Sequence, residues 1–338
     1  MKKIKILHGN CIDKIKELDD NSIDCVVSSP PYFGLRDYGV EGQFGLEKTY
    51  QEYLSNTVKI FKTFKPKLKD NATVWWNVGD SYSSGKRTST TNQSLRGNKN
   101  YGVTRTPVQE GIKEKDLLMI PNRVAIALQD AGWYIRSEII WHKPNPMPES
   151  VRDRPTSCHE KIWLITKNKK YYYDADAIKE PITDTTAIRL LQKNIDNQKG
   201  SSRANGGMKS NGNMKAMGRK KFDKNMGGSG ASFVDHSGYK KADGTYMINP
   251  TRNKRNVWSV TTKPFKGSHF ATFPKDLIEP CIKAGCPENG TVLDPFGGAG
   301  TTGIVSALNN RNSILIELNS EYIKIAEDRI EKELGLFI

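Results

Sequence analysis

The chain has 338 residues and a formal net charge of +15 at pH 7. This length is sufficient for one large domain with a smaller insertion. The charge favours a polyanionic partner, most simply nucleic acid, over the alternative of a merely lysine-rich composition. No apolar run is long enough to span a bilayer, and the one after the basic start, residues 1–5, is too short for a signal peptide. No membrane association is expected.

The cysteines and histidines carry no metal or disulfide signature. The five cysteines form no C-x-x-C pair and no disulfide framework, and the five histidines are scattered without an H-E-x-x-H motif. This predicts free thiols, mostly buried, in a reducing cytoplasm, and no structural zinc.

The first elements lead to a rigid bend. A strand over residues 3–8 and a short helix over residues 11–18 precede the buried strand of residues 23–27. That strand runs into Ser28-Ser29-Pro30-Pro31-Tyr32. Two prolines lack N–H donors, fix their own φ angles and hold their predecessors extended. The bend therefore presents the Ser29 hydroxyl, the Pro30 carbonyl and the Tyr32 ring.

Those three groups suit chemistry on an aromatic exocyclic amine. The lone pair of such an amine is delocalised into its ring. Two acceptors for its N–H groups, Ser29 Oγ and the Pro30 carbonyl, would free the lone pair, and Tyr32 could stack on the base. A plain turn is the alternative, because Pro-Pro marks turns generally.

The middle of the chain alternates helices and strands. Residues 34–45 form a glycine- and charge-rich loop, a candidate cover for a site. The polar stretch of residues 81–111 is a candidate contact for the DNA backbone. The remaining elements are a helix over 50–64, a strand over 73–79, a helix over 117–131, and strands over 133–141 and 161–166 that form an antiparallel pair at one sheet edge.

Residues 183–255 form a basic insertion that is rich in glycine, asparagine and serine and poor in core residues. The segment is predicted to contact DNA. The candidate contacts are Arg203, Arg219, Lys220, Lys221, Arg252 and Arg255.

The C-terminal part has the pattern of a nucleotide-type βαβ unit. A strand-like return over 257–260 precedes a helix over 273–284, where Pro280 implies a kink or a shorter helix. The strand of residues 291–294 then enters Pro295-Phe296-Gly297-Gly298-Ala299-Gly300-Thr301-Thr302, which opens a helix, and a last strand ends at Glu317. Such a turn brings backbone close to a ligand. It matches neither a P-loop nor G-x-G-x-x-G, which disfavours a dehydrogenase.

The bend and the loop from Asp294 to Thr302 together resemble the DNA amino-methyltransferases that use S-adenosyl-L-methionine. The catalytic bend comes first and the cofactor loop last, as in the circularly permuted beta group. The resemblance implies an α/β Rossmann-like fold, doubly wound around a mostly parallel seven-stranded sheet. It implies a catalytic half at 1–182, a target-recognition insertion at 183–255 and a cofactor half at 256–338.

The resemblance also assigns roles to residues. The catalytic bend is Ser29, Pro30, Pro31 and Tyr32, and Trp141 with Lys143 would line the base pocket. Asn10, which stands where the family usually has Asp, would contact the amine of the cofactor's adenine, and Glu317 would bind its ribose. The other cofactor candidates are Asp294, Pro295, Phe296, Gly297, Gly300, Thr301, Thr302, Phe273 and Pro274.

In the resembling family, Ser before Pro-Pro-Tyr favours cytosine N4, which leaves adenine N6 as the alternative. No Pro-Cys pair in the family pattern for attack on cytosine C6 is present, which disfavours carbon-5 methylation. A catalytically silent DNA-binding protein and an RNA or protein methyltransferase are alternatives of other classes. Double-stranded DNA is the expected partner. A cognate restriction endonuclease, and either a monomer or a homodimer, stay open.

Overall fold

The computed structural model describes residues 3–83, 109–185, 188, 238–240, 246–248, 250–262 and 273–335. Most of the polar stretch of residues 81–111 and most of the basic insertion lie outside the described residues, as do Arg203, Arg219, Lys220 and Lys221. The chain divides into two compact units, one of residues 1–177 with 255–338 and one of residues 178–254.

An eight-stranded sheet forms the first unit, in the order β1-β12-β11-β2-β3-β5-β4-β10. β1, β12, β11, β2 and β3 run parallel, β5 is antiparallel to β3 and β4, and β10 is parallel to β4. The strands are β1 (Ile4–His8), β2 (Ile23–Ser28), β3 (Leu68–Val78), β4 (Tyr134–His142), β5 (His159–Thr166), β10 (Val257–Ser259), β11 (Thr291–Asp294) and β12 (Asn312–Glu317).

The sheet differs from the predicted one at a single edge. The antiparallel pair of β4 and β5 is confirmed. The predicted count of seven strands is wrong by one, because β10 adds an eighth beside β4, and β10 therefore forms that edge. Three residues of pairing, Val257 to Ser259 against Ile140 to His142, are enough to dock it.

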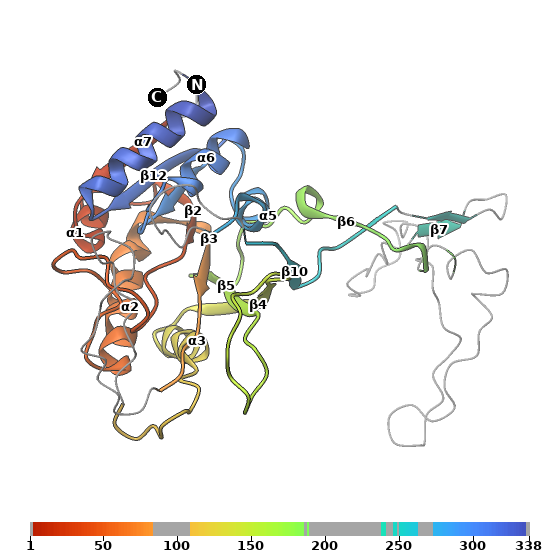
Figure 1. Ribbon diagram of the computed structural model, residues 1–338. Helices are drawn as coiled ribbons and strands as arrows, with labels where there is room; N and C mark the ends of the chain where they lie inside the picture. The colour runs from red at the N-terminus through yellow and green to blue at the C-terminus, as the bar shows by residue number, and fades with distance from the viewer. Residues whose placement is uncertain are drawn as a thin grey trace. The chain divides into compact units, whose positions relative to one another are not determined.

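Helices cover both faces of the sheet, as a doubly wound fold requires (Figure 1). α1, α2 and α3 pack against one another on one side, and α5, α6 and α7 on the other. The helices are α1 (Cys11–Lys16), α2 (Tyr50–Phe64), α3 (Ile120–Asp130), α5 (Lys275–Gly285), α6 (Thr301–Leu308) and α7 (Ser320–Leu334), with 3-10 turns at Lys65–Lys67 and Asp176–Ile178.

α5 continues through Pro280, so the shorter helix considered from the sequence is wrong. Proline removes one intrahelical hydrogen bond. The residues beyond it, Cys281, Ile282 and Ala284, are buried. Burying that apolar face offsets the lost bond.

β3 is buried on both faces, which explains its apolar sequence. The Trp76 ring meets Phe61 of α2, with ring centroids 5.0 Å apart. Trp75, on the opposite face, lies beneath the end of α5, where a Cβ on Gly285 would come 2.3 Å from Trp75 Nε1. Only glycine allows this close approach of helix and sheet.

The strand order changes direction between β11 and β2. From β11 the chain continues outward to β12, whereas from β2 it continues the opposite way to β3. Val292 and Leu293 of β11 pair with Cys25 and Val26 of β2. Ligands of open α/β sheets bind at the carboxyl ends of the strands at such a switch point. The pairing of β11 with β2 thus places the bend after β2 beside the glycine-rich loop after β11.

The second unit contains two small antiparallel pairs within its described residues. β6 (Glu180–Pro181) pairs with β9 (Thr251–Arg252), and β7 (Gly238–Lys240) pairs with β8 (Tyr246–Ile248).

Two expectations from the sequence, on membrane-spanning segments and on the cysteines, can be compared with the structure. Within the described residues, no helix is long and apolar enough to cross a bilayer. All five cysteines are free, and Cys25, Cys281 and Cys286 are buried, as predicted.

Candidate active site

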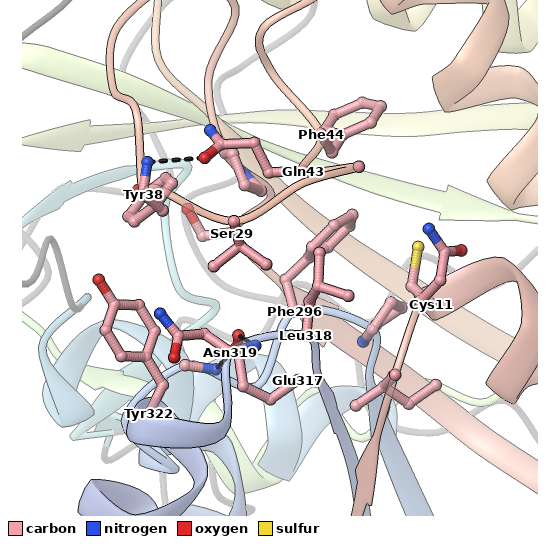
Figure 2. Close-up of a pocket in the computed structure, with 18 of the residues that line it drawn as sticks. Cys11, Ser29, Tyr38, Gln43, Phe44, Phe296, Glu317, Leu318, Asn319 and Tyr322 are labelled. Carbon is pink, nitrogen blue, oxygen red and sulfur yellow. Dashed lines mark hydrogen bonds between the residues drawn. The ribbon is translucent and has the colours of Figure 1, made fainter. Parts of the chain in front are cut away.

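A pocket opens at the carboxyl ends of β1, β2, β11 and β12 (Figure 2). Each of these strands contributes the residues that follow it. The lining residues are Gly9, Asn10, Cys11, Ser29, Pro31, Tyr38, Val40, Gly42, Gln43, Phe44, Pro295, Phe296, Gly298, Ala299, Ile316, Glu317, Leu318, Asn319 and Tyr322.

The Asp294 carboxylate connects three segments next to the pocket by hydrogen bonds. Its Oδ1 accepts hydrogen bonds from Ser28 Oγ at 2.6 Å and from the Phe296 N–H at 3.0 Å, and its Oδ2 accepts from Thr302 Oγ1 at 2.6 Å. Ser28 ends β2, Phe296 lies in the loop, and Thr302 begins α6. One side chain therefore connects the strand end before the bend of residues 29–32 to the glycine-rich loop.

Burial governs the protonation of Asp294, which is 1% exposed. Loss of hydration disfavours the charged form and raises the pKa of the Asp294 carboxyl from 3.8 to about 7. The hydrogen bonds from Ser28, Thr302 and Phe296 act in the opposite direction, and nearby Glu317 adds to the rise. The carboxyl therefore titrates near neutral pH.

The Glu317 carboxylate stands at the end of β12 and is held by backbone. Its Oε2 accepts from the Gly298 N–H and its Oε1 from the Asn319 N–H, both at 2.8 Å. Burial raises the pKa of Glu317, and these backbone N–H groups oppose that rise. Each oxygen keeps a second lone pair, so the fixed carboxylate can accept further hydrogen bonds from a ligand.

The loop after β11 owes its shape to its glycines and to α7. Gly298 and Gly300 have φ angles of +48° and +75°, a region that favours glycine. The Arg329 guanidinium of α7 donates to the Ala299 carbonyl at 3.0 Å and to Thr301 Oγ1 at 2.8 Å. The shape of the loop is thus set by its own glycines and by hydrogen bonds from Arg329, independently of a ligand.

Only some of the residues predicted in the loop after β11 line the pocket. Pro295 and Phe296 line the pocket, whereas Asp294, Gly297, Gly300, Thr301 and Thr302 are absent from its wall. Thr302 is fully buried against Asp294.

Two other residues predicted to bind the cofactor do not line the pocket. Phe273 and Pro274 precede α5, where Pro274 is the N-cap, and neither lines the pocket. The resemblance alone placed them there.

Asn10 does line the pocket, at the N-cap of α1. Its Oδ1 accepts from the Ile12 N–H at 2.9 Å, which leaves the amide nitrogen as a donor toward a ligand. An aspartate at this position could only accept.

The loop of residues 34–45 covers the pocket, in agreement with the sequence. Figure 2 shows Tyr38, Gln43 and Phe44 across the pocket from Glu317 and Tyr322. Gln43 Oε1 accepts from the Tyr38 N–H at 2.7 Å, and the Tyr38 ring meets Tyr322 of α7 edge-on. The sequence reasoning missed Tyr38 and Phe44, because their positions depend on how this loop folds. It also missed Asn319 and Tyr322, which the start of α7 brings to the pocket.

The wall chemistry fits a nucleoside-like ligand. Phe296, Ile316 and Leu318 offer apolar contact. Glu317 offers acceptors to vicinal hydroxyls, and Asn10 offers a donor to a ring nitrogen. A flat ring with an attached sugar satisfies both kinds of group.

A polar network surrounds the bend of residues 29–32. Ser29 Oγ donates to Tyr32 Oη at 3.1 Å, and Tyr32 Oη donates to Glu160 Oε2 at 2.5 Å. Asn77 Nδ2 donates to Tyr32 Oη at 2.8 Å and to Glu160 Oε2 at 3.0 Å. The Tyr53 hydroxyl donates to the Pro31 carbonyl at 3.2 Å and steadies the bend.

Asn77 and Glu160 are site residues that the sequence reasoning missed. Asn77 lies near the end of β3, and Glu160 lies on the antiparallel strand β5. Their proximity follows from strand pairing, so no local pattern could reveal it. A polar Asn77 inside the apolar run of β3 was the one available signal.

Of the two residues predicted to line the base pocket, Lys143 contacts this network directly and Trp141 contacts Lys143. Lys143 forms an ion pair with Glu160 Oε1, and its Nζ lies 4.4 Å from the centre of the Trp141 ring. Trp141 is buried, with its indole N–H bonded to the Val260 carbonyl at 2.8 Å. The buried Trp141 ring therefore packs against the ammonium group of Lys143.

Two predicted DNA contacts lie among the described residues. Arg255 is exposed. Arg252 is half-buried and forms an ion pair with Glu180 of the same unit, N to O at 2.9 Å. Arg252 thus has a structural partner already.

Comparisons with known proteins identify the family of the chain. The model of a DNA methylase family matches residues 23–328. The type II methyltransferase M.SmaI of Serratia marcescens is 40% identical over 333 residues, which cover 98% of this chain and 91% of that protein. M.Cfr9I of Citrobacter freundii is 39% identical over 328 residues, covering 97% and 88%.

Solved structures share the fold. The cytosine-N4-specific PvuII DNA methyltransferase has a TM-score of 0.59 at 16% identity, covering 97% of this chain and 86% of that one. The protein TTHA0409 from Thermus thermophilus, complexed with S-adenosyl-L-methionine, has a TM-score of 0.56 at 17% identity, covering 99% of this chain and 96% of that one. The chain belongs to the DNA methylase family that includes N6 and N4 methyltransferases, as its two motifs predicted.

The titration of Asp294 gives a test of its burial. A carboxyl whose pKa is higher in the folded chain binds its proton more tightly there, so it reduces the free energy of unfolding as pH rises from 3.8 to about 7. Asp294→Asn keeps an acceptor for Ser28 and removes this titration. The wild-type free energy of unfolding, measured relative to the variant by urea denaturation, should fall across that pH range. Glu317 is present in both proteins, and parallel pH curves would contradict the burial argument.

Proposed function

We propose that the protein is a site-specific DNA methyltransferase that methylates the exocyclic amine of a flipped base, cytosine N4. The observation that carries the proposal is Ser29. It lies in the pocket wall, follows β2 directly, and precedes two prolines. Its place before Pro-Pro-Tyr, and the cytosine-N4 specificity of the fold neighbour from PvuII, support N4 over N6.

S-adenosyl-L-methionine would supply an electrophilic methyl group on a sulfonium sulfur. Glu317 would hold its ribose hydroxyls, and Asn10 would meet its adenine ring. The backbone of Pro295 to Ala299 would lie against its methionine end. Asp294, Thr302 and Arg329 would hold that loop without touching the ligand.

The bend would make the exocyclic amine more nucleophilic by accepting hydrogen bonds from its two N–H groups. Ser29 Oγ uses its proton on Tyr32 and can accept from the amine with a free lone pair. The Pro30 carbonyl would accept the second N–H of the amine. Flipping a base out of the duplex costs a few kcal/mol, and stacking on the Tyr32 ring would return about 1–3 kcal/mol. The rate enhancement would come from positioning within a preorganised polar pocket.

The nucleoside product tests the function. The protein is incubated with labelled S-adenosyl-L-methionine and plasmid DNA, and the DNA is digested to nucleosides. We expect label in N4-methylcytosine. Label in N6-methyladenine would replace the proposed base by the alternative, and absence of label would favour the catalytically silent DNA-binding protein.

The cofactor assignment of Glu317 predicts a loss of affinity. Hydrogen bonds to a charged group contribute about 1.5–3 kcal/mol, so Glu317→Ala should weaken S-adenosyl-L-methionine binding about tenfold or more in calorimetry. Glu327→Ala, which removes an exposed carboxylate of α7, is the matched control and should leave affinity unchanged. Equal affinity of both variants would contradict the assignment.

Sequence recognition is assigned to the basic segment of residues 183–255. It is strongly basic and forms much of a separate compact unit, residues 178–254. The relatives M.SmaI and M.Cfr9I are type II methyltransferases, so we extend to this chain a role in a type II restriction-modification system.

A segment exchange tests the recognition assignment. Residues 183–255 are replaced by the matching segment of a relative that methylates a different site, and methylated positions are mapped by sequencing. The chimera should methylate the donor's site, because base contacts specify sequence whereas phosphate contacts only position the protein. An active chimera that keeps the original site would place the reader elsewhere, with residues 81–111 as the next candidate.

A further inference from the structure

A chain of hydrogen bonds leads from the reacting end of the site to a carboxylate. Ser29 Oγ donates to Tyr32 Oη, and Tyr32 Oη donates to Glu160 Oε2. The two distances, 3.1 and 2.5 Å, both lie within hydrogen-bonding range. The path therefore joins a hydroxyl in the pocket wall to the half-buried Glu160 on β5.

The direction of these bonds is fixed by the Glu160 carboxylate. A carboxylate only accepts, so the Tyr32 hydroxyl donates its single proton to Glu160, and the remaining bond runs from Ser29 Oγ to Tyr32 Oη. Lys143 pairs with the other oxygen of Glu160 and holds the carboxylate in place. Among the described residues, Lys143 and Tyr32 are the ionisable groups bonded to Glu160.

Amine methylation creates a proton that must leave. When the amine nitrogen gains a methyl group it becomes positively charged, and neutrality returns only when an N–H bond breaks. A serine hydroxyl is a poor final acceptor. Burial and nearby Glu160 raise the pKa of Tyr32 well above its ordinary value of 10.0, so its phenol stays neutral and can only pass a proton on. A carboxylate is needed at the end of the path.

We propose that Ser29, Tyr32 and Glu160 form a proton relay in which Glu160 is the terminal acceptor. The amine proton passes to Ser29 Oγ, the Ser29 proton to Tyr32 Oη, and the Tyr32 proton to Glu160 Oε2. The electron pair of the broken N–H bond stays on the amine nitrogen, and Glu160 ends as a neutral carboxylic acid. The inference rests on the proposed function only in placing an exocyclic amine at Ser29, and it holds for cytosine or adenine.

The relay gives the Tyr32 hydroxyl a role that stacking does not. The Tyr32 ring lies against Gly79, where an added Cβ would come 2.5 Å from ring atom Cε2. Tyr32→Phe keeps that ring and its packing and removes only the hydroxyl. A stacking residue tolerates this change, whereas a relay residue does not.

The test is a double-mutant cycle in single-turnover methylation of DNA. General acid–base groups contribute about 100-fold or more, so Tyr32→Phe and Glu160→Gln should each reduce the rate by about that factor. The double variant should be no slower than the slower single variant, because both changes break one path. Glu160→Asp should restore part of the rate. The calorimetric affinity of Tyr32→Phe for S-adenosyl-L-methionine should match wild type, and a cooperative thermal transition above the assay temperature should show that the variant is folded.

Glu138→Gln is the matched control. Glu138 of β4 pairs with Lys161 of β5, N to O at 2.5 Å, and so joins the same two strands away from Ser29. Its loss should leave the methylation rate unchanged. If Glu160→Gln does not fold, the rate of Tyr32→Phe alone decides between relay and stacking.

Two results would overturn the relay while leaving the proposed function in place. One is an active wild type whose rate survives Tyr32→Phe. The other is a double variant whose loss equals the product of the two single losses, which would mean that the groups act independently. A wild-type protein that transfers no methyl group to any DNA would overturn the proposed function itself, and the relay with it.

Discussion

The carboxylate of Asp294 is the interaction on which the site depends. It joins the end of β2, the turn after β11 and the start of α6 through three hydrogen bonds. These elements come from opposite ends of the chain, since Ser28 and Asp294 are 266 residues apart. The Ser28 bond lies one residue before Ser29, so it fixes the bend relative to the loop. A shift of either would separate the two halves of the pocket.

Burying this carboxylate is costly, and the cost is visible in its raised pKa. Three donors compensate for lost hydration, and they also make Asp294 specific for one loop geometry. Glu317 repeats the arrangement at the next strand with backbone donors. Around Ser29 the third carboxylate, Glu160, is held by Lys143, Tyr32 and Asn77. The site therefore consists of fixed carboxylates at strand ends, each with a different set of partners.

Much of the fold could be predicted because its signals are local. The helix of residues 50–64 and the strand of residues 291–294 were predicted at their observed bounds. Helix periodicity and Lys-Pro after Phe64 sufficed for the first, and the glycine-rich turn sufficed for the second. The helix predicted over 273–284 is observed as Lys275–Gly285, and packing against the sheet decided that it continues through Pro280. The pairing of β10 with β4 was missed, because it also depends on tertiary packing.

The sequence by itself determined the family, the bend at Ser29 to Tyr32, the glycine-rich loop and the acid at Glu317. Each is a short run whose backbone chemistry is set by its own prolines, glycines or strand end. Only the tertiary structure decided that Asp294 supports the pocket rather than lining it, and that Asn77 and Glu160 meet Tyr32. Such contacts depend on the register between β2, β3 and β5. Register is fixed by burial of whole strand faces, which no single stretch of sequence encodes.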